Sequence, residues 1–299
     1  SGATGVALQP GQLWAANGSN EVLQQLLQAF GGPGRRAMGF EPSYSMHPLI
    51  SLATGTGWVA GEREADFSLT PDGVRAQVER EQPDVVFLTS PNSPTGSAVD
   101  PAVVEAVLEA APGMVVVDEA YAEFSARPSA VRLLAGNPRL VVVRTMSKAF
   151  ALAGARVGYL AAAPEVVDAL MLVRLPYHLS ALTQATARAA LAHAPAVLAT
   201  VEAVRDERDR VVVALRGLGL DVVDPDGNFV LFSTGGREKR DLWQALLDRG
   251  VLVRDVGLPG WLRVTAGLPD ENDAFLIALT AVLEGAPTGA TGLGMRETA

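Results

Sequence analysis

Three apolar runs in the sequence end directly before residues that could do chemistry. The first precedes the polar segment Thr89 to Gly96, the second precedes Asp118, and the third precedes a segment that contains Lys148. In open α/β sheets, functional groups collect outside the carboxyl ends of the strands. We therefore expect these three segments to contribute to one site.

Lys148 supplies a primary amine in an unusual context. The residues that follow it, 149 to 154, are small and mostly apolar, which disfavours a solvated surface role. Desolvation favours the neutral form of a lysine amine and makes it a better nucleophile, as imine formation with an aldehyde requires. A lone lysine at a strand–loop junction is also explained as a surface residue, so the prediction depends on its neighbours.

Asp118 directly follows four apolar residues, where an unpaired carboxylate would be costly to bury. It could cap a helix. Alternatively, it could keep a pyridine nitrogen protonated, so that the ring withdraws electrons from a substrate Cα. Tyr121, three residues later, could donate to the phenolic oxygen of such a ring or simply pack in the core. With Lys148, this pattern indicates pyridoxal 5'-phosphate as cofactor.

The sequence also offers an anion site. A polar pair precedes an apolar helical stretch at residues 22 to 27, and helix N-termini attract phosphate, although plain capping explains such a pair as well. Hydroxyl and guanidinium groups near the lysine add donors suited to phosphate. The candidate phosphate ligands are Ser19, Asn20, Thr145, Ser147 and Arg156.

The elements expected to position these residues form an α/β fold. Short apolar runs at 85–88, 114–117, 140–143 and 157–161 are typical of buried strands in a parallel sheet. A helix is predicted from Asp100 to Ala111, with Asp100 as its cap and Pro101 in its first turn. Strand–helix–strand repetition predicts a large, mostly parallel sheet domain over residues 1–188.

From residue 189 the pattern changes to that of a smaller α+β domain, expected over 189–284. The predicted helices are 195–215, 239–248 and 271–283, and the predicted strands are 229–232, 251–253 and 261–264. The remaining residues, 285–299, are rich in Gly, Thr and Ala and are expected to form a mobile tail.

Composition excludes several classes of protein. The 299 residues carry a net charge of −9, which disfavours a general nucleic-acid binder, and the absence of cysteine excludes disulfides and thiolate chemistry. The three histidines lack metal-ligand spacing, so no metal site is expected. No signal peptide and no apolar run of about 18 residues is present, so we expect a cytoplasmic protein without a membrane partner.

Nearly the whole chain, from about Leu13 to Leu276, resembles the fold-type-I aminotransferases, and within them the histidinol-phosphate aminotransferases, with similarity to actinobacterial members. The segment from Arg144 to Tyr159, RTMSKAFALAGARVGY, is the most specific match to the family's lysine loop. Further matches are WAANGSNE at 14–21, VDEAY at 117–121 and LVRLPY at 172–177.

The resemblance implies a role for each position. Lys148 would hold the cofactor as a Schiff base and then shuttle a proton between Cα and C4′. Asp118 would pair with the pyridine nitrogen and Tyr121 with the phenolic oxygen. The resemblance also implies a stacking residue and two arginines for the substrate's anionic groups, Arg263 with Arg254 as its helper. The cofactor-binding residues would be Ser19, Asn20, Tyr44, Ser93, Asp118, Tyr121, Thr145, Ser147, Lys148 and Arg156, with Tyr44 stacked on the ring.

Two departures from the family pattern stand out. The family's PNNPTG motif appears as PNSPTG, with Ser93 in place of the second Asn, so we expect weaker tuning of the imine rather than loss of the cofactor. Relatives also carry a segment ahead of Leu13 that closes over the substrate and reaches the partner subunit's cofactor. We expect this chain to lack that segment, to hold the cofactor and to turn over slowly.

The activity implied is ping-pong transamination between histidinol phosphate and 2-oxoglutarate, giving imidazole-acetol phosphate and glutamate in histidine biosynthesis. A two-fold homodimer is expected from the same resemblance. The alternatives are an aromatic-amino-acid aminotransferase or a phosphothreonine decarboxylase on the same fold, and a truncated chain that binds pyridoxal phosphate with little turnover.

Overall fold

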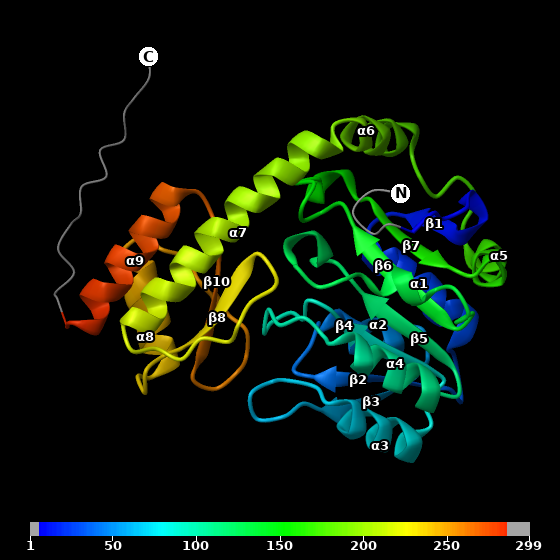
Figure 1. The fold of residues 1–299 in the computed structure, drawn as a ribbon, viewed down its shortest axis with the longest axis horizontal. Coiled ribbons are helices and arrows are strands. Elements are labelled where there is room, and N and C mark those ends of the chain that lie inside the picture. Colours follow the sequence, from blue (N-terminus) through cyan, green and yellow to red (C-terminus); the bar gives the residue numbers. More distant parts are fainter. Residues whose placement is uncertain (1–5, 286–299) are drawn as a thin grey trace. The chain divides into compact units, whose positions relative to one another are not determined.

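The computed structural model describes residues 6–285 (Figure 1). Within them the chain divides into two compact units. The first contains residues up to 202 together with 225–227, and the second contains 203–224 and the residues from 228.

A seven-stranded sheet forms the centre of the first unit. Its strands are β1 (Leu13–Ala16), β2 (Arg36–Glu41), β3 (Gly57–Glu62), β4 (Val85–Thr89), β5 (Met114–Asp118), β6 (Leu140–Thr145) and β7 (Gly158–Ala162). Their order is β1-β7-β6-β5-β4-β2-β3. Neighbouring strands from β6 to β3 are parallel, which confirms the predicted mostly parallel sheet.

The prediction for β7 was only partly right. The strand exists, but it runs antiparallel to both of its neighbours, β1 and β6. A parallel return normally needs a crossover helix. The connection from β6 to β7 contains only the 3₁₀ turn η4 (Ala153–Ala155), so the chain doubles back instead of crossing the sheet.

Helices cover both faces of this sheet (Figure 1). On one face, α3 (Pro71–Glu81) and α4 (Pro101–Ala110) pack against side chains such as Val115 and Val117 of β5. On the other face, α1 (Ser19–Phe30) and α5 (Pro164–Val173) pack against residues such as Val116. The alternation along β5 places Val117 and Asp118 on opposite faces. The unit also contains α2 (Met46–Ala53), α6 (Ala181–Ala192) and the 3₁₀ turns η1 (Pro10–Gln12), η2 (Ala122–Phe124) and η3 (Ala130–Leu133).

Helix α4 begins as the sequence predicts. The side chain of Asp100 accepts a hydrogen bond from the backbone N–H of Ala102 at 3.0 Å, and Pro101 occupies the first position of the helix. The cap and the proline together fix where the helix after β4 starts.

The second unit is built on a three-stranded antiparallel sheet. The order is β8-β10-β9, with β8 (Phe229–Ser233), β9 (Arg254–Asp255) and β10 (Trp261–Thr265). Its helices are α8 (Lys239–Leu247), α9 (Pro269–Leu283) and the part of α7 (Ala194–Gly217) that follows residue 202. Apolar side chains from all three helices and from the sheet form one core, which confirms a smaller α+β unit.

The strand predicted at 251–253 was wrong. Those residues are not in a strand, and β9 covers only Arg254–Asp255. The backbone explains the difference. The N–H of Val251 bonds to the carbonyl of Leu246 at the end of α8, and the carbonyl of Val253 accepts from the indole N–H of Trp243 at 2.8 Å. These two backbone groups therefore bond to nearby residues and not to a neighbouring strand, although Val253 itself is buried.

The boundary proposed from the sequence, after residue 188, falls inside α6, whereas the contact division falls after residue 202, inside α7. The proposed mobile tail lies outside the described residues, apart from Gly285. Within residues 6–285, no helix combines the length and the hydrophobicity that crossing a bilayer requires.

Candidate active site

The predicted lysine, aspartate and tyrosine lie at one edge of the first unit's sheet. Asp118 is the last residue of β5 and lies in register with Thr89 of β4 and Val143 of β6. Lys148 follows three residues after the end of β6, and its Nζ lies 5.3 Å from the centre of the Tyr121 ring. The carboxyl ends of neighbouring parallel strands thus bring together groups that are far apart in the sequence.

Asp118 is 2% exposed, and both of its carboxylate oxygens have partners. Oδ2 lies 3.2 Å from Nε2 of His47, and Oδ1 accepts from the N–H of Ala120 at 3.1 Å. With Asp118 ionised, Nε2 of His47 carries the hydrogen and donates it. The high cost of burying a lone carboxylate is offset by these two donors.

His47 is a site residue that the sequence reasoning missed. It lies in α2, is 2% exposed, and stacks on Phe87 with ring centres 4.6 Å apart. Its one sequence signal was its position three residues after Tyr44, which puts Tyr44 just before α2 and His47 in the first turn of that helix. Their rings meet edge to face at 5.4 Å. His47 therefore links the aspartate to the predicted stacking residue.

Three predicted phosphate ligands cluster beside the start of α1. The Nη1 of Arg156 donates to Ser147 Oγ at 3.5 Å, and Thr145 Oγ1 donates to Ser147 Oγ at 2.9 Å. A Cβ atom added to Gly18 would collide with the guanidinium of Arg156, so this group lies directly over the residue that precedes α1. Gly18 has φ +84°, a conformation that glycine adopts without strain. Free N–H groups, two hydroxyls and a guanidinium therefore converge where an anion could bind.

Tyr44 and Asn20 form a hydrogen-bonded pair at the start of α1. Tyr44 Oη donates to Asn20 Oδ1 at 3.1 Å. Burial raises the pKa of the Tyr44 hydroxyl, and the neighbouring charge of Asp118 also raises it, so this side chain stays protonated as a donor. Ser19 is the first residue of α1.

The loop after β4 is held in part by Asn92. Asn92 is fully buried, donates to the carbonyl of Pro42 at 3.0 Å, and accepts from the hydroxyl of Ser43 at 2.8 Å. Ser93 is only partly buried. The first asparagine of the motif therefore joins two loops at the sheet edge, and Ser93 occupies the more accessible position.

Arg263 and Arg254 belong to the second unit, where they are cross-strand neighbours in β10 and β9. The guanidinium of Arg263 lies 4.4 Å from the centre of the Phe229 ring and is half-buried. Arg254 is exposed. Both arginines line one open hollow of about 560 Å³, with Trp243 and Thr265. The structure thus brings these two candidates together within their own unit.

The environment of Lys148 differs from the prediction. Its side chain is exposed in this chain, whereas the next residue, Ala149, is buried. The apolar stretch after the lysine is therefore explained by its own packing and does not cover the amine. The sequence contains one other lysine, Lys239, whose ammonium is bound to Asp255 at 2.7 Å in the second unit.

A buried charge cluster supports the same sheet edge from the opposite face. Arg144, in β6, contacts Glu119 at 2.7 Å and Glu123 at 3.2 Å. The second oxygen of Glu123 is buried without a hydrogen-bond partner among the described residues. Burial raises the pKa of Glu123, and the attraction of Arg144 offsets this shift only partly.

We predict that Glu123→Gln makes the stability of the chain less dependent on pH. Because the folded-state pKa is raised, the folded chain retains a proton that the unfolded chain releases, so stability falls as pH rises from about 4.3, the ordinary glutamate value, through the raised value. Glutamine mimics the protonated acid and removes this loss. When unfolding midpoints are measured from pH 4 to 8, the midpoint of the variant should increase relative to that of the wild type as pH rises.

The control is Glu109→Gln, which removes an exposed carboxylate paired with Arg75. It should leave the pH profile of the wild type unchanged. Parallel profiles for wild type and Glu123→Gln would contradict the prediction.

Comparison with known proteins agrees with this geometry. Residues 2–278 match the family model described as aminotransferase class I and II. A histidinol-phosphate aminotransferase of Frankia casuarinae is 63% identical over 97% of this chain and 74% of its own length. One of Streptomyces avermitilis is 61% identical over 89% of this chain and 73% of its own length.

Solved structures show the same fold. A histidinol-phosphate aminotransferase of Sinorhizobium meliloti, solved in complex with pyridoxal-5'-phosphate, superposes with a TM-score of 0.83 at 26% identity, over 93% of this chain and 78% of that one. An aspartate aminotransferase of Thermus thermophilus with maleate gives 0.79 at 25% identity, over 94% and 78%. The chain belongs to the class I and II aminotransferases and, within that family, to the histidinol-phosphate aminotransferases.

Proposed function

We propose that this chain transfers an amino group between histidinol phosphate and 2-oxoglutarate, giving imidazole-acetol phosphate and glutamate, as a pyridoxal-phosphate enzyme of histidine biosynthesis in the cytoplasm. The observation that carries the proposal is the buried Asp118–His47 pair at the sheet edge that also carries Lys148 and Tyr121. Relatives named histidinol-phosphate aminotransferase at 57–63% identity support the choice of substrate.

The donor set at this edge fits pyridoxal phosphate. Asp118 would hold a proton on the pyridine nitrogen, and Tyr121 would donate to the ring oxygen. Tyr44 would stack on the ring, and Ser93 would line it. The phosphate would bind the groups gathered at the start of α1: Ser19, Asn20, Thr145, Ser147 and Arg156. When bound, the cofactor supplies an electron sink for the bond that breaks at the substrate's Cα.

Lys148 would have two tasks. Its Nζ would hold the cofactor covalently in the resting enzyme, and after the substrate's amine displaces it, the same nitrogen would move a proton from Cα to C4′. The exposed position of Lys148, beside the Tyr121 ring, leaves the amine accessible for both tasks.

Arg263 would bind the anionic group of each substrate, and Arg254 would assist. A guanidinium presents two parallel N–H donors, which match a carboxylate of glutamate and a phosphate of histidinol phosphate equally well. The aromatic contact with Phe229 would hold the guanidinium plane of Arg263 in a fixed orientation.

The test is a half-reaction followed by substrate comparison. The purified chain with pyridoxal phosphate should show a visible band of lysine-bound cofactor that bleaches when glutamate or histidinol phosphate is added. The value of kcat/KM should favour histidinol phosphate over phenylalanine. Preference for phenylalanine would favour an aromatic-amino-acid aminotransferase, and a band that ignores all amino donors would identify a cofactor-binding chain with little turnover.

Replacing Arg156 with glutamine should weaken cofactor binding by roughly 10- to 100-fold, because a hydrogen bond to a charged group contributes about 1.5–3 kcal/mol. Fluorescence titration of the apo chain with pyridoxal phosphate would measure the change in Kd. Arg127→Gln is the matched control, since that arginine pairs with Asp100 at the surface. Equal affinities for the two variants would remove Arg156 from the phosphate site.

We also propose that the chain forms a two-fold homodimer. Several large apolar side chains from the last turn of α5 to the first turn of α6 are exposed, and patches of this kind mark protein interfaces. They are Leu172 (87% exposed), Leu175 (73%), Tyr177 (97%) and Leu182 (81%). Light scattering after gel filtration should give twice the chain mass, and Leu172→Glu should shift the protein toward the monomer. A wild-type monomer at micromolar concentration would contradict this.

A further inference from the structure

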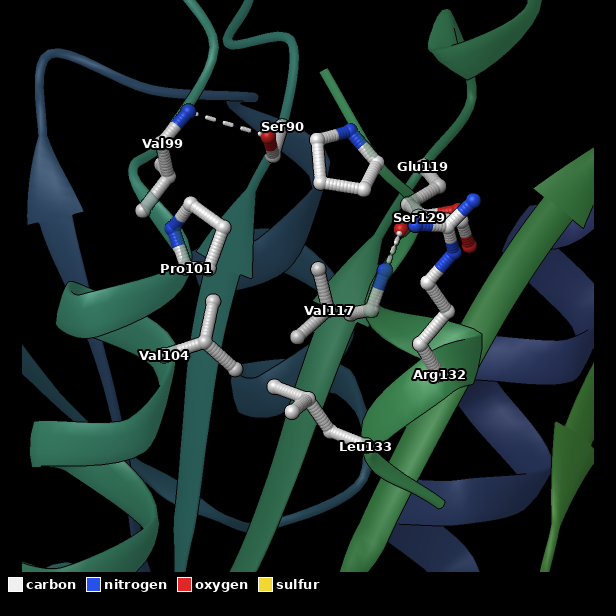
Figure 2. Close-up of a pocket in the computed structure, with 11 residues that line it drawn as sticks. Ser90, Val99, Pro101, Val104, Val117, Glu119, Ser129, Arg132 and Leu133 are labelled. Carbon is white, nitrogen blue, oxygen red and sulfur yellow. Dashed lines mark hydrogen bonds between the residues drawn. The ribbon is translucent and has the colours of Figure 1, made fainter. Parts of the chain in front are cut away.

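The first unit contains a cavity of about 130 Å³ that the proposed reaction does not use. Figure 2 shows it between the start of α4, the end of β5 and the turn η3. Val117 lines it, and this side chain points to the face of the sheet opposite to that of Asp118. The cavity is therefore separate from the candidate active site.

We propose that this cavity binds a small uncharged molecule with one apolar ring and one hydrogen-bond acceptor. Its size supports a single ring, because an engineered apolar cavity of about 150 Å³ binds benzene. Most of the lining is apolar, with Val104, Val117 and Leu133 as its main side chains.

The polar groups at the rim disfavour a charged ligand. Glu119 lines the cavity, and its carboxylate is already satisfied by the N–H of Ala130 at 2.6 Å, the hydroxyl of Ser129 at 2.7 Å and the guanidinium of Arg144 at 2.7 Å. An anion beside Glu119 would meet its negative charge, and the cationic residue of the lining, Arg132, is exposed and has an interaction of its own. A cation would compete with Arg144 for a carboxylate that has no free oxygen. An uncharged molecule avoids both costs.

Ser90 supplies a directional contact. It lies beside the cavity, and its Oγ accepts a hydrogen bond from the N–H of Val99 at 3.0 Å (Figure 2). Among the described residues, the Ser90 hydroxyl donates no hydrogen bond. That hydrogen is therefore available to a ligand oxygen, which is why we assign an acceptor to the ligand.

Phenol and toluene are suitable probes because they differ only in the polar atom. The full chain, loaded with pyridoxal phosphate and labelled at Val and Leu methyl groups, would be titrated with each and followed by NMR. We expect saturable shifts at Val104, Val117 and Leu133, with a Kd for phenol on the order of 1 mM. Shifts confined to the opposite face, such as those of Val116 and Val143, would place the binding elsewhere and overturn the proposal.

The variant Ser90→Ala tests the polar contact without filling the cavity. It should weaken phenol binding by roughly fivefold, the value of one neutral hydrogen bond, and leave toluene unchanged. Benzoate should bind more weakly than phenol. Equal loss for phenol and toluene, or tighter binding of benzoate through Arg132 at the rim, would overturn the assignment of an uncharged acceptor ligand.

Discussion

Replacing Lys148 with alanine should abolish transamination, with a fall in rate of at least about 10⁴-fold, because proton transfer alone contributes 10²–10⁴-fold and the covalent attachment is lost as well. The visible band of lysine-bound cofactor should disappear. Noncovalent binding of pyridoxal phosphate should persist, since Asp118 and the groups around Arg156 remain. Absorbance and a coupled glutamate assay would measure both effects.

The near absence of lysine makes this prediction unusually sharp. Borohydride reduction fixes a lysine-bound cofactor in place, and peptide mapping then has two lysines to distinguish, Lys148 and Lys239. We expect the label on the Lys148 peptide alone. Lys239→Ala is the matched control. It should keep the visible band, the label on the Lys148 peptide and the wild-type rate of transamination. A label on Lys239, or a Lys148→Ala variant that still turns over, would refute the assignment.

The second large effect is expected at Asp118. Asparagine keeps the shape of the side chain and can still accept from His47, but it carries no charge to hold a proton on the pyridine nitrogen. Removing one preorganised electrostatic contact of this kind costs about 10²–10³-fold in rate. We expect kcat/KM for Asp118→Asn to fall by that amount and the absorbance of the bound cofactor to shift.

Two variants separate the charge from its surroundings. Asp100→Asn changes an exposed helix cap and should leave rate and spectrum unchanged. His47→Gln keeps a donor toward Asp118 and should cause a smaller loss than Asp118→Asn. If Asp118→Asn retained the wild-type rate, the carboxylate would have a structural role only, with His47 as its packing partner.

Local patterns were sufficient for much of the fold. The strands β4, β5 and β6 are apolar on both faces, and α4 carries its own cap and proline, so each element is determined within a few residues of sequence. The strand prediction at 251–253 failed because it also used only the local pattern. Apolar β-branched residues favour a strand. Here, however, the backbone N–H of Val251 bonds to the end of α8, and the carbonyl of Val253 bonds to the Trp243 side chain.

The exposure of Lys148 and the role of His47 could not be derived in this way. Exposure depends on what other segments cover, and a contact such as that of Asp118 with His47 joins residues 71 positions apart. The direction of β7 could not be derived locally either. It depends on whether the connection can form a crossover helix, which the strand itself does not encode.

By itself the sequence determined the alternation of strands and helices, the identity of the amine, carboxylate and guanidinium groups, and their positions after particular strands. Those features follow from local hydrophobic period, caps and residue chemistry. Only the tertiary structure decided which groups meet: the histidine behind Asp118, the guanidinium over Gly18, and the apolar cavity beside Ser90. The physical reason is that burial and hydrogen-bond partners are set by segments distant in sequence, which strand order and register bring to the same edge of the sheet.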